Sequence, residues 1–510
     1  MPIPIVNSIA SWFLKKRIHH MELFMKYPNE VQHELLMNLI RFAKKTDVGQ
    51  QYDFKSIKSY KDFAERVPVQ TYEEFETDIE RARNGENNIF WPTPIKLFAK
   101  SSGTTNSKSK FIPVSEESLE DCHFAASKDL LCFYLNNNPD ASLFTGKSLR
   151  LGGSKQIFKD KGTSYGDLSA LLIDNMPFWA SYSSTPNNDI SLMGEWETKM
   201  NAIINETIHE NVTSLAGVPS WMLVLLNRVL EKTGAKDIKE VWPNLEVYFH
   251  GGVSFAPYTE QYQQIIPDKT FRYYEIYNAS EGFFAAKDQN NSEELLLFLD
   301  YGIFYEFIPM DTYGNEQEKV IPLSQVEVGK NYAMIITTNA GLWRYKIGDT
   351  VRFTSILPYR IKVSGRTKHF INAFGEELII ENAENALRKT SKILDVEIAD
   401  YTAAPIFMHG KEKGAHEWII EFNKAPKDPN KFAEVLDCEL QKLNSDYEAK
   451  RTNNMTLNQL KLNIARKGLF YDWLAQNDKL GGQHKIPRLA NNRKYVEELL
   501  LLNGKEFVEM

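Results

Sequence analysis

Three apolar runs in the middle of the chain each end in small residues, and helical patterns separate them. VTSLAGV (212–218), LEVYFHGG (245–252) and FRYYEIYNASEG (271–282) predict buried strands. Pro219 is expected to open a helix between the first two strands, because proline is favoured at the first helical position. Strands that alternate with helices indicate an α/β architecture, in which ligands bind at the carboxyl ends of the strands.

The remaining pattern divides the 510 residues into two domains, 1–365 and 366–510. Successive short strands with Gly and Asn turns from 296 to 365 favour a barrel or an antiparallel sheet. The predicted fold class is therefore α/β, with a large N-terminal domain of helix-flanked sheets plus a β-barrel, and a smaller α+β C-terminal domain. Helices are expected at 20–45 with Asn29 as N-cap, and at 71–84, 187–211, 380–389 and 428–450.

Composition excludes several classes of protein. The formal net charge of -7 is spread along the chain, which argues against a nucleic-acid surface. No run approaches the roughly 20 apolar residues that a membrane span requires, so no integral membrane association is expected. The first 20 residues place their charges after the apolar part, the wrong order for a signal peptide, and are expected to form an amphipathic helix.

Three cysteines, Cys122, Cys132 and Cys438, lack metal-ligand spacing, and their odd number suits a reducing compartment. We expect all three to be buried as small hydrophobic residues. The protein is accordingly predicted to be cytoplasmic, and the sequence leaves its oligomeric state open.

The segment SSGTTNSKSKFIP (101–113) has the chemistry of a phosphate loop without the spacing of a Walker A motif. Gly103 lets the backbone turn, and backbone N–H groups, hydroxyls and ammonium groups together can hold a triphosphate. The groups in question are those of Ser101, Ser102, Thr104, Thr105, Lys108 and Lys110. Taken alone, the segment is equally typical of a solvated surface loop.

Four further segments carry chemical groups, and each has a plain structural explanation when taken alone. In YNASEG (277–282), Glu281 can hold Mg²⁺ and Tyr277 can stack on a base, or the segment is a strand-end turn. In WRYKIGD (343–349), Asp349 can accept both hydroxyls of a ribose, or it belongs to a common β-turn. GRTKHFINAFGEEL (365–378) also fits a charged hairpin, and GGQHKIPR (481–488) fits a loop with a solvated Lys485.

In this order and spacing, the segments together resemble the adenylate-forming superfamily, which includes acyl-CoA ligases, peptide-synthetase adenylation domains and luciferases. HGGVS (250–254) lies where the adenine-contacting glycine strand of that superfamily lies. Within it, the chain is most similar to the auxin-responsive acyl acid–amido synthetases. The features shared with that family are SSGTT followed by K-x-K-x-I-P, Y-x-x-S-E-G-F-F, and the late G-Q-x-K-x-P-R.

The resemblance implies a role for each residue of these motifs. Binding of the β- and γ-phosphates is implied for Ser101, Ser102, Thr104 and Thr105, assisted by Lys110. Contact with adenine or the α-phosphate is implied for Gly251, Gly252, Tyr277 and Ser280. The remaining implied roles are coordination of Mg²⁺ by Glu281, binding of the ribose by Asp349, contact with the ribose or hinge closure by Arg366, and approach to the α-phosphate by Lys485.

The reaction that the resemblance implies is that of a ligase. ATP and a carboxylic acid give an acyl-adenylate and pyrophosphate, and an amino acid amine then attacks, releasing AMP. A mobile C-terminal domain, 366–510, is expected to act as a lid over the ATP- and acyl-binding domain, 1–365, and residues between about 120 and 220 to line the acyl pocket. The residues themselves name neither the acid nor the acceptor.

Alternatives remain at this point. They are an acyl-CoA ligase or acyl-protein synthetase, and a catalytically silent nucleotide-binding protein. Two departures from the superfamily pattern are Lys368 at the hinge and Lys346 in YKIGD.

Overall fold

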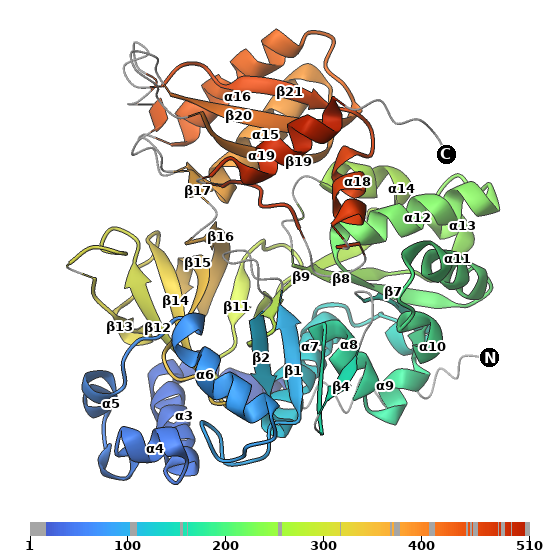
Figure 1. Cartoon of the computed structure of the whole chain (residues 1–510). Coiled ribbons are helices and arrows are strands. Elements are labelled where there is room, and N and C mark those ends of the chain that lie inside the picture. The colour runs from blue at the N-terminus through green and yellow to red at the C-terminus, as the bar shows by residue number, and fades with distance from the viewer. Residues whose placement is uncertain are drawn as a thin grey trace. The chain divides into compact units, whose positions relative to one another are not determined.

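The computed structural model describes residues 17–101, 110–152, 157–160, 162–252, 255, 258–316, 318–367, 370–371, 378–406, 414–444, 447–448, 451, 457–477, 479–480, 485–490 and 492–504. The chain forms two compact units (Figure 1). The first contains Met1–Ile347, Val351–Val363 and Gly481–Gln483, and the second contains Gly348–Thr350, Ser364–Leu480 and His484–Met510. Within the described ranges, no helix is long and apolar enough to cross a membrane.

A 12-stranded sheet forms the framework of the first unit. Its order is β13 (Ile321–Pro322), β12 (Ile303–Pro309), β14 (Asn331–Thr338), β15 (Tyr345–Ile356), β16 (Tyr359–Arg366), β11 (Leu295–Leu297), β10 (Gly282–Lys287), β9 (Arg272–Ala279), β8 (Val247–Gly251), β7 (Val212–Gly217), β3 (Lys147–Leu151) and β6 (Ser184–Thr185). Strands β6, β3, β7, β8 and β9 pair in parallel. The α/β fold class and all three central strands are thus confirmed.

The strands between 296 and 365 extend this same sheet. β12 pairs antiparallel with β13 and β14, and β11 pairs antiparallel with β10 and β16. The segment expected as a barrel or antiparallel sheet is therefore antiparallel and continuous with the parallel strands. Continuity leaves no unpaired edge where the two patterns meet.

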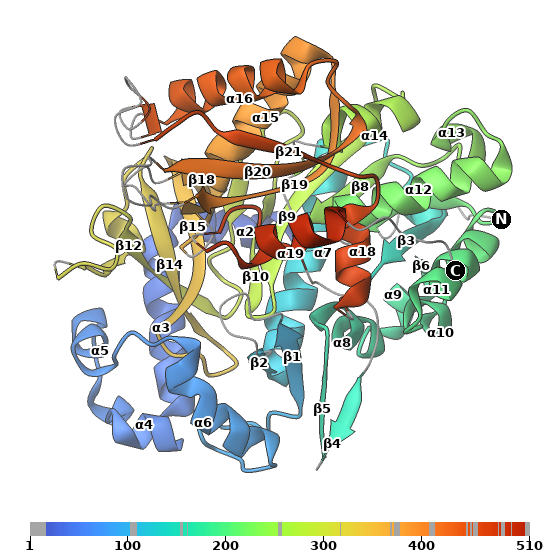
Figure 2. The ribbon, with the colours of Figure 1, turned by 45° about the horizontal axis from the view of Figure 1, so that its top comes forward.

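Helices cover both faces of the parallel strands. α12 (Pro219–Thr233) begins at Pro219 as predicted and ends at Gly234 in the left-handed conformation. α11 (Trp196–Thr207) packs against α12, α13 (Ile238–Val241) follows, and α14 (Thr259–Ile265) stacks Tyr262 on Tyr248 of β8 (Figure 2). On the other face, the π-helical η2 (Ser118–Phe124) leads into α7 (Ala125–Asn137), whose Tyr134 contacts Phe249 of β8.

A four-stranded sheet carries the loop predicted to bind phosphates. Its order is β2 (Lys110–Val114), β1 (Leu97–Ser101), β5 (Thr163–Gly166) and β4 (Phe158–Asp160). The elements that connect it to the large sheet are η3 (Leu143–Thr145), α8 (Leu168–Asp174), α9 (Phe178–Tyr182) and α10 (Asn188–Ser191). The helix expected over 187–211 is therefore two helices, α10 and α11.

The N-terminal region is helical. It comprises α2 (Ile18–Lys26), α3 (Pro28–Ala43), α4 (Asp47–Gln51), η1 (Phe54–Ser56), α5 (Tyr60–Arg66) and α6 (Tyr72–Arg83). The single helix expected over 20–45 is interrupted at Tyr27, and Asn29 as its N-cap was wrong, because Tyr27 occupies the cap position before Pro28. α6 is confirmed, and its capping box joins Thr71 and Glu74.

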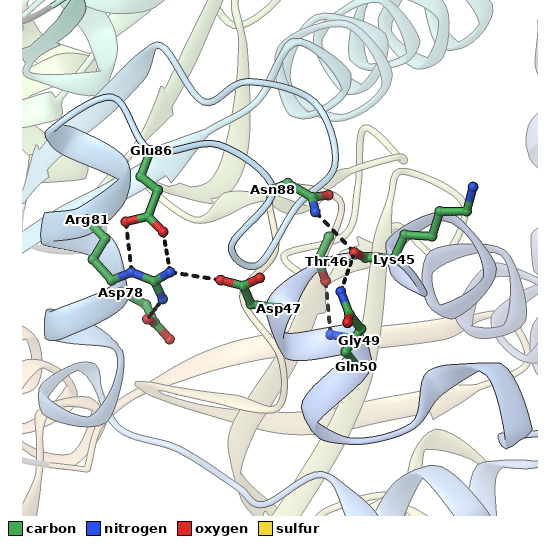
Figure 3. Close-up of polar contacts among 9 residues, drawn as sticks. All are labelled: Lys45, Thr46, Asp47, Gly49, Gln50, Asp78, Arg81, Glu86 and Asn88. Atoms are coloured by element: carbon green, nitrogen blue, oxygen red, sulfur yellow. Dashed lines mark hydrogen bonds and ion pairs between the residues drawn. The ribbon is translucent and has the colours of Figure 1, made fainter.

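Arg81 ties α6 to its neighbours (Figure 3). Its guanidinium lies 2.8 Å from Asp47 of α4 and 2.8 Å from Asp78, and it also binds Glu86 in the loop that follows α6. These hydrogen bonds raise the pKa of Arg81, the bond to Glu86 most strongly. The three carboxylates fix the position of the loop at this exposed corner of the unit.

The second unit is an α+β domain. It contains α15 (Ile380–Leu394), α16 (Pro429–Leu443), α18 (Leu469–Gln476), α19 (Lys494–Asn503), the hairpin β17 (Phe370–Ile371) and β18 (Leu378–Ile379), and a sheet in the order β19 (Glu397–Ile406), β20 (Ala415–Lys424) and β21 (Lys461–Ala465). α15 and α16 cover one face of this sheet and α19 the other (Figure 2). Apolar side chains such as Leu387, Trp418 and Leu436 form its core.

The cysteines correct one expectation. Cys122 and Cys132 are buried, whereas Cys438 on α16 is exposed. The expectation that all three are buried was wrong for Cys438, because its position on the helix faces away from the apolar stripe of Phe432, Leu436 and Leu440.

Candidate active site

The first part of the candidate site is the turn between β9 and β10. Ser280 and Glu281 form a two-residue hairpin turn, since Ala279 pairs with Gly282. Ser280 is buried and Glu281 is partly exposed. The backbone N–H of Phe283 donates to the Cys122 Sγ at 3.3 Å, which ties the turn to η2. The turn therefore holds a hydroxyl and a carboxylate side by side directly beyond the carboxyl end of β9.

Gly251, at the end of β8, lies beside β9. It pairs with Ile276, and a Cβ at Gly251 would lie 2.4 Å from the Ile276 carbonyl oxygen. Only glycine fits this contact, which leaves bare backbone at the strand end for the close approach of a ligand. Gly252 follows with φ of 78°, in the region that favours glycine. The strand predicted to contact adenine therefore ends in two positions, Gly251 and Gly252, that favour glycine.

Two aromatic groups flank this strand end. The Tyr277 ring is buried against Phe284, with ring centroids 4.9 Å apart. The His250 ring stacks on Phe255, with ring centroids 4.3 Å apart. Burial, and to a smaller degree the charge of Lys287, lowers the pKa of His250 to about 3, so this ring is neutral at physiological pH. His250 therefore adds no positive charge beside this strand end.

The β1–β2 hairpin positions the predicted phosphate loop. Ser101 pairs with Lys110, so these two residues close the hairpin across the intervening loop. The ammonium of Lys110 lies 5.2 Å from the centre of the Tyr72 ring, a cation–π distance. Ser102, Thr104 and Thr105, predicted to bind phosphate, lie outside the described residues, as does the side chain of Ser101.

The second part of the site belongs to the second unit. Gly348 has φ of 89° and turns the chain into Asp349, which is buried on β15. Arg366, at the end of the adjacent strand β16, places its Nε 2.8 Å from an Asp349 carboxylate oxygen. The backbone N–H of Thr367 donates to the Gly348 carbonyl at 2.8 Å and holds the two strand segments together. Asp349 and Arg366, predicted separately, are therefore neighbours.

Lys485 belongs to the same group of charges. Desolvation and the positive charge of Arg366 lower the pKa of Lys485 to about 7, while Asp349 acts in the opposite direction. Desolvation is the largest cause of this lowering and the charge of Arg366 the second, although Lys485 is exposed. A lysine with a lowered pKa beside other charged groups is a candidate functional residue, because perturbed pKa values are frequent at functional sites.

The departure noted at Lys346 has a local explanation. Its ammonium lies 2.6 Å from Glu318 and 5.4 Å from the centre of the Tyr313 ring. Lys346 is therefore engaged within the first unit. Lys368, the other departure, lies outside the described residues. Cys122 is buried as predicted, but its contact with the β9–β10 turn was not predicted, because no local feature of the sequence links the two segments.

Glu281 is the residue that fits a Mg²⁺ role. Within the described residues, no three or more His, Cys, Asp or Glu side chains form a metal-binding group. Mg²⁺ is commonly held by one or two carboxylates together with substrate phosphates and water, without a complete protein cage. A single, partly exposed carboxylate at a strand end, next to the buried Ser280, suits this mode of binding.

Models of one protein family match most of the chain. The GH3 family N-terminal domain matches residues 17–271, its central domain matches 296–366, and its C-terminal domain matches 381–494. Gly251 and Gly252 fall within the N-terminal domain match, and Tyr277, Ser280 and Glu281 fall between this match and that of the central domain. Asp349 and Arg366 fall within the central domain match, and Lys485 within the C-terminal domain match.

Curated relatives match along almost their full length. The chain is 23% identical to the indole-3-acetic acid-amido synthetase GH3.4 of Arabidopsis thaliana, over 93% of this chain and 92% of that protein. It is also 23% identical to a jasmonoyl-L-amino acid synthetase of Oryza sativa subsp. japonica, over 95% and 96%.

Solved structures share the fold. The GH3.15 acyl acid amido synthetase in complex with 2,4-DB matches with a TM-score of 0.80 at 18% identity, over 98% of this chain and 97% of that one. A 2-hydroxyisobutyryl-CoA ligase bound to an acyl-AMP matches with a TM-score of 0.61 at 12% identity, over 93% and 92%.

Proposed function

The chain belongs to the GH3 family, and from this premise we propose that it uses ATP and Mg²⁺ to couple a small carboxylic acid to the amine of an amino acid. It is an adenylate-forming, amide-forming ligase, as its amido synthetase relatives are. The observation that carries the proposal is the β9–β10 turn, which places Ser280 and Glu281 beyond the strand next to Gly251.

The proposed adenylation step requires the acid carboxylate to attack the α-phosphate while pyrophosphate leaves. We assign contact with adenine to Gly251, Gly252 and Tyr277, proximity to the α-phosphate to Ser280, and Mg²⁺ to Glu281. Bound Mg²⁺ would neutralise charge on the phosphates. The β- and γ-phosphates are assigned to Ser101, Ser102, Thr104, Thr105 and Lys110.

The three charged residues of the second unit complete the assignment. Asp349 accepts hydrogen bonds from the ribose hydroxyls, and its ion pair with Arg366 orients the carboxylate. Lys485 supplies positive charge where two anions, the acid and the α-phosphate, meet. The positive charge of Lys485 is needed for adenylation and is not needed when a neutral amine attacks. A domain that moves between the two steps meets both conditions, which supports the proposal that 366–510 is a lid over the ATP- and acyl-binding domain 1–365.

An amine is favoured over a thiol as the acceptor. The similarity to the CoA ligase covers the fold and the adenylation chemistry that both classes share. The amido synthetases match at higher TM-score and through all three family domains. A cytoplasmic location remains part of the proposal, and it rests on three free cysteines and on composition.

The test measures pyrophosphate and AMP release by the purified full chain. The first acids to be tested are indole-3-acetate, which the name of a curated relative contains, and 2,4-DB, which is bound in a solved structure of the same fold. A panel of aliphatic and aromatic acids follows. We expect ATP-dependent pyrophosphate release with at least one acid, and acceleration of AMP release by amino acids. Thioester formation with CoA and no response to any amine would overturn the proposal.

A further inference from the structure

Arg150 stands apart from the other arginines of the first unit. It lies on β3, one residue before the carboxyl end of a parallel strand. Its one hydrogen bond within the described residues is from Nη1 to the thioether sulfur of Met176, at 2.7 Å. A thioether is a weak acceptor, and a guanidinium carries five N–H donors. No ion pair with a described carboxylate involves Arg150, and a desolvated cation without an anion is costly.

The register of the parallel strands locates the Arg150 side chain. Arg150 pairs with Ala216, Ala216 with Phe249, and Phe249 with Tyr274. Paired residues of adjacent strands project to the same face of a sheet. Phe249 and Tyr274 both contact Tyr134 of α7, so Arg150 projects to the α7 face.

The same register gives the distance to the proposed ATP site. Gly251 projects to this same face, two residues beyond Phe249 on β8. The Cα atoms of Arg150 and Gly251 are separated by two strand spacings of about 4.8 Å across the sheet and by two residues of about 3.3 Å along the strands. They therefore lie roughly 12 Å apart. An extended arginine side chain reaches about 6 Å, so the guanidinium comes within one small molecule of the adenine strand when it turns away from Met176, whose sulfur lies on the β6 side of β3, 3.9 Å from the Ser184 hydroxyl oxygen.

The strand end between these two residues is small and accessible. Gly152, Ala216, Gly217 and Val218 are each partly exposed, although they lie near the middle of the parallel sheet. Most residues of β7 before Ala216 are buried. Among the described residues, small ones are therefore partly exposed at the strand ends between Arg150 and Gly251.

A fully buried cation nearby contrasts with the partly exposed Arg150. Lys199 on α11 is fully buried, and its ammonium donates to the Gly152 carbonyl at 3.1 Å. Burial lowers its pKa to about 8, and the charge of Asp167 opposes this shift. Burial lowers the pKa of Arg150 to about 10 with no acidic residue opposing it. Within the described residues, Lys199 has its partners in the protein, whereas Arg150 has only the sulfur of Met176.

We propose that Arg150 binds the carboxylate of the acceptor amino acid. The inference rests on the proposed function, because it concerns the second half-reaction of that same site. There the neutral amine nitrogen forms a bond to the acyl carbon, the bond from that carbon to the AMP phosphate oxygen breaks, AMP leaves with the electron pair, and the amine loses one proton to solvent. A planar guanidinium binds a carboxylate through two parallel hydrogen bonds, which orients the amine at the other end of the acceptor.

The test compares amino acids with amines that lack the carboxylate. The matched pairs are leucine with 3-methylbutylamine, phenylalanine with 2-phenylethylamine, and alanine with ethylamine, each offered with the acid that gives the fastest pyrophosphate exchange. Arg150→Met removes the charge and keeps the side-chain volume. We expect its kcat/KM for the amino acids to fall by roughly 10- to 100-fold, while its kcat/KM for the amines and its ATP–pyrophosphate exchange stay unchanged.

Two variants control the measurement. Arg228→Met removes an arginine of α12 that pairs with Glu197 at the surface, and it should change neither acceptor selectivity nor exchange. Arg150→Lys keeps the charge without the planar fork and should lose part of the selectivity, which makes the proposal testable if Arg150→Met fails to fold. The melting temperature of Arg150→Met should not fall, because the substitution removes a desolvated charge.

Three outcomes would overturn the proposal. The first is an equal loss of kcat/KM for amino acids and for amines in Arg150→Met. The second is a raised KM for the acid in the exchange assay of that variant, which would place Arg150 at the acyl group. The third is a wild-type enzyme that uses amino acids and the matched amines equally well. Absence of exchange with every acid would instead overturn the proposed function, and this proposal with it.

Discussion

The two parts of the candidate site are held in place by different forces. Gly251, Ser280 and Glu281 are positioned by backbone pairing of buried strands, and the Gly251–Ile276 contact leaves no room for a side chain. Asp349 and Arg366 also lie on strands, but their side chains and that of Lys485 act on one another through charge. The first part therefore depends on shape and the second on charge. Substitutions that alter one property at a time separate these contributions.

The largest effect is expected at the strand-end turn. Glu281→Gln keeps the shape of the turn and removes the charge assigned to Mg²⁺. We expect ATP–pyrophosphate exchange to fall by on the order of 10²- to 10³-fold, because the metal ligand is lost. Titration with MgCl₂ checks the cause, since the variant should need more Mg²⁺. The control is Glu65→Gln, an exposed residue of α5, and an unchanged Mg²⁺ dependence would remove Glu281 from the metal site.

A somewhat smaller and step-specific effect is expected in the second unit. Lys485→Met should slow adenylation by about 10²-fold, because the charge that neutralises the α-phosphate is lost. Amide formation from a supplied acyl-adenylate should stay close to wild type. Single-turnover assays of the two half-reactions measure this split, with Lys467→Met, another exposed lysine of the second unit, as the control. Equal losses in both steps would contradict the assignment.

An effect on stability is expected from shape alone. Gly251→Ala forces a Cβ to within 2.4 Å of the Ile276 carbonyl oxygen. The strands must separate to accept it, so the free energy of unfolding should fall by about 1–3 kcal/mol, together with weaker ATP binding. Thermal melting with and without ATP measures both. The control is Gly504→Ala, whose added Cβ would have its nearest neighbour 3.7 Å away, and it should melt like the wild type. A Gly251→Ala variant that also melts like the wild type would contradict the close strand contact.

The smallest effect is a shift in pH dependence. Lys485 supplies charge only when protonated, and its pKa is lowered to about 7, so kcat/KM for adenylation should decline as pH rises through this range. The charge of Arg366 contributes to that lowering. Arg366→Gln should therefore raise the pKa of Lys485 and move the decline to higher pH by up to about one unit. Arg366→Lys should leave the midpoint near its wild-type value, and a shift in the opposite direction for Arg366→Gln would contradict the coupling.

Local patterns predicted much of the fold. The strands at 212–218, 245–252 and 271–282, the helix from Pro219 and the acidic helix at 71–84 all follow from residue spacing and end signals that act within a few residues. The errors occurred where a local break was missed. Pro28 divides the first long helix, and a turn near 192–195 divides the helix expected over 187–211.

The sequence by itself determined which chemical groups the protein carries and that they stand at strand ends. A glycine, a hydroxyl or a carboxylate after an apolar run is a local feature of the chain. The tertiary structure alone decided which of these groups are neighbours. The contact of Arg366 with Asp349 depends on how the consecutive strands β15 and β16 pair. The place of Arg150 in the same row as Phe249 depends on the register between strands far apart in sequence. A shift of one residue in that register would turn each side chain to the other face of the sheet.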